Sequence, residues 1–206
     1  MKRIDTDLPG VCILEPDVFG DARGFFLETW SQARYAELGL SESFVQDNVS
    51  KSARGILRGL HLQHPYGQGK LVQVLHGEVF DVAVDVRSDS PTFAQWYGTF
   101  LSGENHRQLY IPPGFAHGFC VTSESALFMY KCTVGYHRET ELGVAWDDPD
   151  LAIPWPERSP QLSAKDAVWP RLRDIPRDRL PTLDTAQPGT TEPAANRWPL
   201  RLVSGT

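Results

Sequence analysis

Lys70-Leu71-Val72-Gln73-Val74-Leu75-His76-Gly77-Glu78-Val79-Phe80-Asp81-Val82-Ala83-Val84-Asp85-Val86 is the stretch that decides the fold. It opens with a β-rich run over 70–75, and His76-Gly77 is typical of a tight turn. From Val79 onward, apolar residues largely alternate with others, which is the period of a strand with one buried face. The stretch therefore predicts two successive strands that meet at a glycine.

Strand signals continue on both sides of this stretch. The segments expected to form strands are 11–15, 25–30, 93–101, 108–111, 116–121 and 126–133. Residues 19–24 are expected to form a turn, and Ser31 to cap a short helix that ends at Gly39. Turn signals recur about every ten residues, without a long helical period or βαβ alternation, so an all-β sandwich or jelly roll is favoured.

Length and composition set the outer limits. The chain has 206 residues and is 41% hydrophobic, which fits one domain over 1–180 followed by a Pro/Thr-rich tail over 181–206. A net charge of −6 argues against a nucleic-acid partner. There is no apolar run of about 20 residues and no signal-peptide core, so no membrane association is expected. Three cysteines without CxxC spacing suggest reduced thiols, and we expect a cytoplasmic protein.

Polar residues are densest between Gln46 and Lys70. Within this segment, Arg58-Gly59-Leu60-His61 places a guanidinium and an imidazole three residues apart. On a regular strand these side chains point to opposite faces, but a turn or bulge near Gly59 would bring both to one side. The alternative is that they are solvated charges at strand ends.

Three further positions are candidates for chemistry. His117 follows a Pro-Pro-Gly turn among Phe, Ala and Gly, so it faces inward either as a core residue or as a site residue. Tyr130 lies on an expected strand and is either a core tyrosine or, in a cavity, a proton donor. The pair Lys165-Asp166 by itself indicates only a surface turn.

Metal and nucleotide-cofactor motifs are missing from the sequence. The spacing is His61-x-x-His64, so the HxH element of metal-binding cupins is absent, although Glu78 and His117 remain as possible ligands. Neither a G-x-G-x-x-G nor a GxxxxGK[ST] loop occurs. We therefore expect no metal and no cofactor.

Several motifs in order resemble the dTDP-4-dehydrorhamnose 3,5-epimerase family, over roughly residues 8 to 170. The motifs are Phe19-Gly20-Asp21-Ala22-Arg23-Gly24-Phe25-Phe26, Gln46-Asp47-Asn48, Gly55-Ile56-Leu57-Arg58-Gly59-Leu60-His61, Gly77-Glu78-Val79-Phe80-Asp81-Val82, Ser90-Pro91-Thr92-Phe93, Pro112-Pro113-Gly114-Phe115-Ala116-His117-Gly118-Phe119, Tyr130-Lys131-Cys132 and Trp146-Asp147-Asp148-Pro149. The resemblance implies a metal-free, homodimeric cupin-type jelly roll. We expect a short helix near its N-terminus and small helical or irregular elements near its C-terminus.

The resemblance also implies the catalytic roles. His61 is similar to the general base that removes a proton beside the C4 ketone, and Asp166 to the carboxylate that orients it. Lys70 is similar to the cation that stabilises the enolate oxygen. Tyr130 is similar to the acid that returns a proton on the opposite face of the sugar ring.

Substrate contacts are implied in the same way. The corresponding positions are Arg23, Phe26, Glu28, Gln46, Asn48, Arg58, His117, Tyr136, Glu141 and Lys165. Among them, Tyr136 is similar to the residue that stacks on thymine, and Arg23 and Glu28 to residues that the partner subunit supplies. The sequence departs from the family pattern at Val49 and at Val134-Gly135, and the second departure removes an aromatic residue beside the stacking position.

The expected function is therefore inversion of C3 and C5 of dTDP-4-dehydro-6-deoxy-D-glucose to give dTDP-4-dehydro-L-rhamnose. One alternative is an epimerase that inverts only C3 or only C5 of a related dTDP-4-keto sugar. A second is a sugar-nucleotide-binding cupin without catalysis, and a third is a metal-dependent cupin enzyme.

Overall fold

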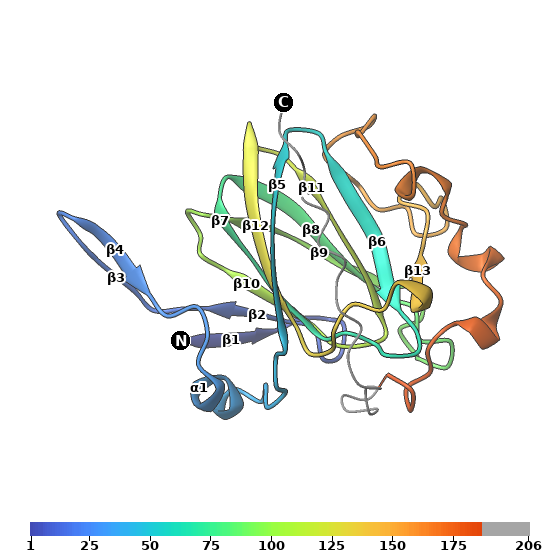
Figure 1. Cartoon of the computed structure of the whole chain (residues 1–206), viewed down its shortest axis with the longest axis horizontal. Helices are drawn as coiled ribbons and strands as arrows, with labels where there is room; N and C mark the ends of the chain where they lie inside the picture. Colours follow the sequence, from blue (N-terminus) through green and yellow to red (C-terminus); the bar gives the residue numbers. More distant parts are fainter. Residues whose placement is uncertain (187–206) are drawn as a thin grey trace.

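The computed structural model describes residues 1–186 as two antiparallel sheets that face each other, with a separate hairpin (Figure 1). The larger sheet has the order β1 (Lys2–Asp5), β2 (Cys12–Glu15), β10 (Gln108–Ile111), β7 (Lys70–His76), β12 (Ser125–Cys132) and β5 (Gln46–Ala53). The smaller sheet has the order β13 (Glu141–Gly143), β6 (Leu57–Gln63), β11 (Phe115–Val121), β8 (Glu78–Asp85) and β9 (Trp96–Ser102). The hairpin is β3 (Val18–Asp21) and β4 (Gly24–Leu27).

Helical structure is confined to short elements, as the cupin-type jelly roll predicted. These are α1 (Gln32–Glu37) and the 3₁₀ turns η1 (Arg138–Thr140), η2 (Asp166–Val168), η3 (Leu172–Asp174) and η4 (Arg177–Arg179). Ser31 lies at the N-cap of α1, although its side chain makes no capping hydrogen bond, and the chain leaves the helix at Gly39. Within residues 1–186, no helix has the length and apolar character needed to cross a bilayer.

The apolar core lies between the two sheets. Val72 and Leu109 come from the larger sheet and Val79 and Phe119 from the smaller one, and all are buried in one cluster. The outer face of the smaller sheet is covered by the segment after β13, where Leu172 and its neighbours pack in a second cluster. Because apolar burial contributes about 25 cal/mol per Å², these two layers hold the smaller sheet firmly on both faces.

The strands predicted on either side of Gly77 are confirmed, with one refinement. β7 and β8 belong to different sheets, so the chain at Gly77 passes from one sheet to the other and does not close a hairpin. This position suits glycine, because a Cβ there would lie 2.0 Å from the Ser125 carbonyl oxygen. Residues 70–86 thus contribute one strand to each of the two sheets.

The structure corrects three expected boundaries. Residues 19–24 are not a turn throughout, because strand pairing in β3 continues to Asp21. The strand expected over 25–30 ends at Leu27. The strand expected from 93 begins at Trp96, since the buried Asp85 carboxylate accepts hydrogen bonds from Ser90 and Thr92 and holds the preceding residues in a turn.

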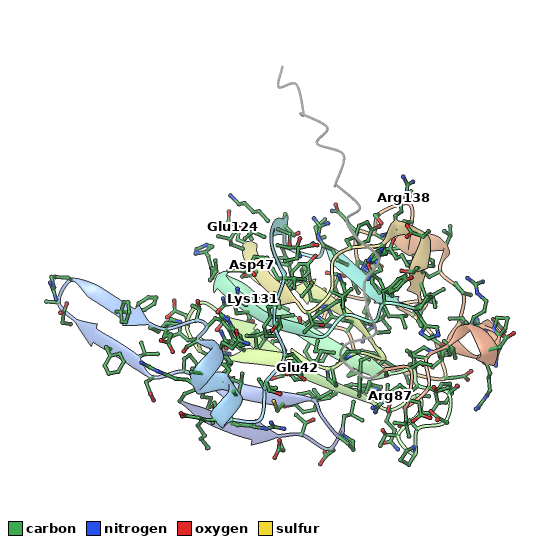
Figure 2. The ribbon with its side chains drawn as sticks, turned by 60° about the horizontal axis from the view of Figure 1, so that its bottom comes forward. Glu42, Asp47, Arg87, Glu124, Lys131 and Arg138 are labelled. Atoms are coloured by element: carbon green, nitrogen blue, oxygen red, sulfur yellow. The ribbon has the colours of Figure 1, made fainter. Side chains whose placement is uncertain are left out.

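The hairpin β3–β4 extends away from the two sheets (Figures 1 and 2), although its Phe25 ring meets the His106 ring at a centroid distance of 4.5 Å. It carries Phe19, Phe25 and Phe26, whose exposed fractions are 66%, 61% and 70%. Large apolar side chains gathered in this way are typical of a surface that meets another chain.

The domain boundary at residue 180 stays a prediction. Residues 187–206, most of the expected tail, lie outside the described residues. Residues 181–186 contact the body: the Leu183 amide donates to the Asp89 carboxylate, and Ala186 is buried.

Candidate active site

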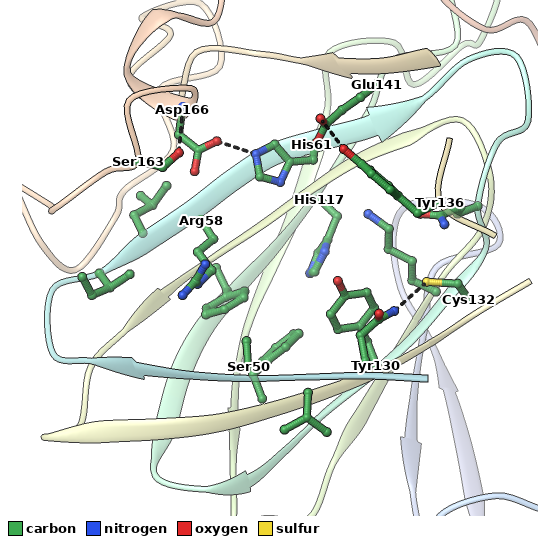
Figure 3. A pocket seen from close by; sticks show the side chains of 18 of the residues that line it. Ser50, Arg58, His61, His117, Tyr130, Cys132, Tyr136, Glu141, Ser163 and Asp166 are labelled. Carbon is green, nitrogen blue, oxygen red and sulfur yellow. Dashed lines mark hydrogen bonds and ion pairs between the residues drawn. The ribbon is translucent and has the colours of Figure 1, made fainter. Parts of the chain in front are cut away.

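A cavity of about 1080 Å³ opens between the sheets and is lined by residues from both (Figure 3). The larger sheet contributes β5, β7 and β12, and the smaller sheet contributes β6, β11 and β13. A cavity of this size, with polar and aromatic walls, suits a ligand as large as a nucleotide sugar.

The bulge expected near Gly59 is confirmed. β6 pairs with β11 at His61–His117 and at Arg58–Phe119, so two residues of β6 oppose one residue of β11 between these pairs. Gly59 has φ +131°, and a Cβ there would lie 2.5 Å from the Gly118 Cα, so only glycine allows this close crossing. As a result, Arg58 and His61 line the same cavity.

His61 and Asp166 form a close pair. The Nε2 atom of His61 lies 2.6 Å from Oδ1 of Asp166, whose side chain is 4% exposed. Burial opposes ionisation of Asp166, but the hydrogen bond and the charge of His61 outweigh it, so the pKa of this carboxyl is lowered. With Nε2 donating to Asp166, Nδ1 keeps its lone pair and points into the cavity (Figure 3).

Asp166 is more buried than its neighbours in the sequence suggested. Its surroundings in the sequence indicated only a surface turn, yet it is 3% exposed at the start of η2. Its own amide donates to Ser163 Oγ at 3.1 Å, which holds the turn that aims the carboxylate at His61. Ser163, which sequence reasoning did not single out, therefore belongs to the support of the site.

Lys70 and Tyr130 enter the cavity from the opposite sheet, on β7 and β12. Burial lowers the pKa of the Lys70 ammonium below its ordinary value. Burial, with a contribution from Cys132, raises the pKa of Tyr130 to about 12. At neutral pH the tyrosine is therefore a neutral hydroxyl that can donate a proton, opposite His61 across the cavity (Figure 3).

His117 lines the cavity and is paired with a carboxylate that sequence reasoning missed. Its Nε2 atom lies 3.0 Å from Oδ2 of Asp81, which is fully buried. Burial lowers the pKa of His117, and the nearby charge of Asp81 opposes this effect only in part. The available signal was a carboxylate within residues 79–84 of β8, which are otherwise apolar, since such a residue needs a buried partner.

The remaining predicted residues of the cavity form two hydrogen-bonded groups, which are joined because the Tyr136 backbone amide donates to Oε1 of Gln46 at 3.1 Å. In the first, Gln46 donates to Asn48, whose amide contacts the Cys132 sulfur at 3.7 Å. In the second, Glu141 accepts from the Tyr136 hydroxyl at 3.0 Å and from the Lys165 ammonium at 2.6 Å.

Three predicted contact residues lie elsewhere on this chain. Arg23 is at the tip of the hairpin, where its side chain is 89% exposed and pairs with Asp21. Phe26 and Glu28 line a separate hollow beside α1. Within one chain the structure does not bring these residues to the cavity.

Among residues 1–186, no group of three or more His, Cys, Asp or Glu side chains could hold a metal ion. The remaining candidates are engaged separately: His117 is paired with Asp81, and Glu78 accepts a hydrogen bond from Thr122. The three cysteines are free and buried, as expected.

The fold and the cavity together define a class, namely a jelly-roll protein whose cavity is lined by a histidine–carboxylate pair, a lysine and a tyrosine. The family model described as dTDP-4-dehydrorhamnose 3,5-epimerase matches residues 5–174. The chain belongs to this family and is an isomerase of the epimerase type, as the sequence predicted.

Individual relatives agree with this assignment. The dTDP-4-dehydrorhamnose 3,5-epimerase of Shigella flexneri is 55% identical over 168 residues, covering 81% of this chain and 93% of the relative. That of Methanothermobacter thermautotrophicus is 51% identical, covering 84% and 95%. The structure of the Legionella pneumophila dTDP-6-deoxy-D-glucose-3,5-epimerase with dTDP-4-keto-L-rhamnose is 54% identical, with a TM-score of 0.86 and coverage of 88% and 97%.

Proposed function

We propose that this chain inverts C3 and C5 of dTDP-4-dehydro-6-deoxy-D-glucose, with His61 as base and Tyr130 as acid. The observation that carries the residue assignment is that the two groups lie on opposite sheets and face one cavity. Inversion requires a proton to leave one face of the sugar ring and another to arrive on the other face. A single residue on one wall cannot do both.

The proposed steps use His61, Lys70 and Tyr130, together with the substrate and protons exchanged with solvent. Nδ1 of His61 takes the proton from the carbon beside the C4 ketone, and the C–H electron pair moves into an enolate. The Lys70 ammonium stabilises the negative O4, which is the main electrostatic need of the reaction. Electrons return from the enolate as Tyr130 delivers a proton to the opposite face, and proton exchange with solvent resets both residues.

Asp166 supports the base in two ways. It accepts from Nε2 and so fixes the tautomer in which Nδ1 can act, and it stabilises the imidazolium that forms. His117, kept neutral by burial, supplies a hydrogen-bonding floor beneath the ring.

The nucleotide end would be bound by the other predicted residues. Arg58 suits the diphosphate because a guanidinium fork matches phosphate oxygens. Tyr136 would stack on thymine, with Glu141 and Lys165 at its hydroxyl end. We also propose a cytoplasmic homodimer in which Arg23, Phe26 and Glu28 complete the partner's cavity.

Proton NMR of dTDP-4-dehydro-6-deoxyglucose in deuterated water tests the proposal. We expect deuterium at both C3 and C5, together with formation of the L-rhamno product. Exchange and inversion at only one of the two carbons would instead indicate an epimerase that inverts only C3 or only C5. Tight binding of dTDP without any exchange would indicate the non-catalytic sugar-nucleotide-binding cupin.

A further inference from the structure

Trp169 lies three residues beyond Asp166 and fills a space that only a glycine leaves open. A Cβ placed on Gly143 would lie 2.2 Å from the Cδ2 and Cε2 atoms of the indole. The indole therefore occupies the volume that any other side chain at position 143 would need. Its Nε1 is buried and has no hydrogen-bond partner within residues 1–186, so packing alone sets the position of the ring.

Gly143 is also the residue of β13 that pairs with His61 of β6. The indole consequently lies beside the proposed base, with ring centroids 6.4 Å apart and the rings at 70°. Trp169 thus touches both the segment that carries Asp166 and the strand that supports His61.

On its N-terminal side, the segment around Asp166 is attached by Lys165, whose ammonium donates to Glu141 of β13 at 2.6 Å. Ala167, Val168, Pro170 and Arg171 are exposed, and Trp169 is the only residue between Asp166 and Leu172 that is partly buried. One backbone bond, from the Ala145 amide to the Pro170 carbonyl at 2.8 Å, reinforces the attachment on its C-terminal side. The tryptophan is therefore the main apolar anchor next to η2.

We propose that Trp169 is a positioning residue: by packing on Gly143, it holds the Asp166 carboxylate at bonding distance from His61. This inference rests on the proposed function of the His61–Asp166 pair. It goes beyond that function because Trp169 does not line the cavity and acts only through Asp166. A small displacement of a catalytic group can cost about 10²-fold in rate.

Trp169→Ala should lower kcat roughly ten- to hundredfold, whereas KM and the Kd for dTDP stay near those of the unchanged protein. Trp169→Phe keeps a ring on Gly143 and should recover most of the rate. The matched control is Trp155→Ala, which removes another partly buried indole, one that packs edge-on against Phe80 and lies away from the cavity lining. It should lower thermal stability and leave kcat unchanged.

Two double variants separate positioning from a general structural role. Gly143→Ala should lose kcat because its methyl displaces the indole, but adding it to Trp169→Ala should cost little further, since the space is then vacant. Trp169→Ala should likewise cost little when Asp166 is already Asn. Full additivity in either pair, or a normal kcat in Trp169→Ala, would overturn the inference. The proposed function fails separately, if His61→Asn retains exchange.

Discussion

At the scale of single residues, the cavity contains two histidines that each bond a buried carboxylate through Nε2. They differ in solvent contact: the His117 side chain is 8% exposed and that of His61 is 25% exposed. A fully buried imidazole resists charging, whereas one at the cavity wall can take a proton and pass it to water. The structure therefore favours His61 as the base and His117 as a neutral hydrogen-bonding group.

His61→Asn should abolish exchange of the C3 and C5 protons in deuterated water. Loss of a general base lowers the rate of proton transfer about 10²–10⁴-fold. Among the described residues, no other histidine is paired with Asp166, so no second imidazole can replace His61. Asp166→Asn should be intermediate, because the base remains but loses its orienting charge. Near-normal exchange in His61→Asn would remove the assignment of the base.

Tyr130→Phe should separate exchange from inversion. His61 and Lys70 are unchanged in this variant, so the enolate still forms and the base can return deuterium to the original face. We expect residual exchange with much reduced inversion, measured in the same NMR experiment. If inversion continues at the normal rate, Tyr130 is a core aromatic and not the acid.

The fall of activity on the alkaline side of the pH profile should result from deprotonation of Lys70. Its ammonium is charged below its pKa, and burial lowers that pKa from an ordinary value of about 10.4. Activity should therefore fall as pH rises through the lowered value, while Tyr130, with a pKa of about 12, is still protonated. In Lys70→Arg the limb in kcat/KM should move to higher pH, because a guanidinium stays charged. If the alkaline limb stays at the same pH in Lys70→Arg, a group other than Lys70 is responsible for it.

At the scale of elements, strand patterns in the sequence located β7, β8, β11 and β12, but they missed β1, β5, β6 and β13 and did not indicate sheet membership. Residues 70–75 form a β-rich run and apolar residues largely alternate from Val79 onward, but neither pattern says that β7 and β8 enter different sheets. The bulge at Gly59 was predictable because chemistry-bearing residues stood three apart around a glycine. Trp169 was not, since its role arises from packing against Gly143, which is distant in sequence.

The proposed catalytic residues also differ in how far the sequence alone could predict them. Tyr130 lies on a strand that the sequence predicted, and His61 became a candidate through the glycine at position 59, whereas Asp166 begins the short 3₁₀ turn η2 and was recognised only through the family resemblance. A buried carboxylate in an irregular segment has no periodic signature. Its partner, 105 positions away, becomes visible only when the chain is folded.

The exposed hairpin β3–β4 leads to a prediction about subunits. If Arg23 completes the partner's cavity, Arg23→Ala and His61→Ala should each inactivate the homodimer. A mixed dimer of the two variants should regain activity, because one cavity then has both residues intact. Co-expression with two affinity tags isolates the mixed dimer for assay. Absence of complementation, or a fully active monomer in sedimentation, would contradict the shared site.

At the scale of the whole molecule, the jelly roll explains why one cavity can serve both faces of a sugar. The two sheets arise from alternating stretches of the chain, so the residues that face each other are far apart in sequence and fixed on separate walls. Preorganised groups on rigid strands need little movement during the reaction, which is the condition under which electrostatic stabilisation is most effective.

The same arrangement predicts that activity does not depend on a metal. A cupin metal site needs several ligands converging from neighbouring strands. Here His61 and His117 each have a carboxylate on Nε2, and Glu78 is bonded to Thr122. Lys70 is placed to supply the positive charge that a metal would otherwise provide at O4. We therefore expect full activity after exhaustive chelation, with metal content measured by elemental analysis of the same sample. Activity that is lost on chelation and restored by one divalent ion would instead establish a metal-dependent enzyme and would require a different role for Lys70.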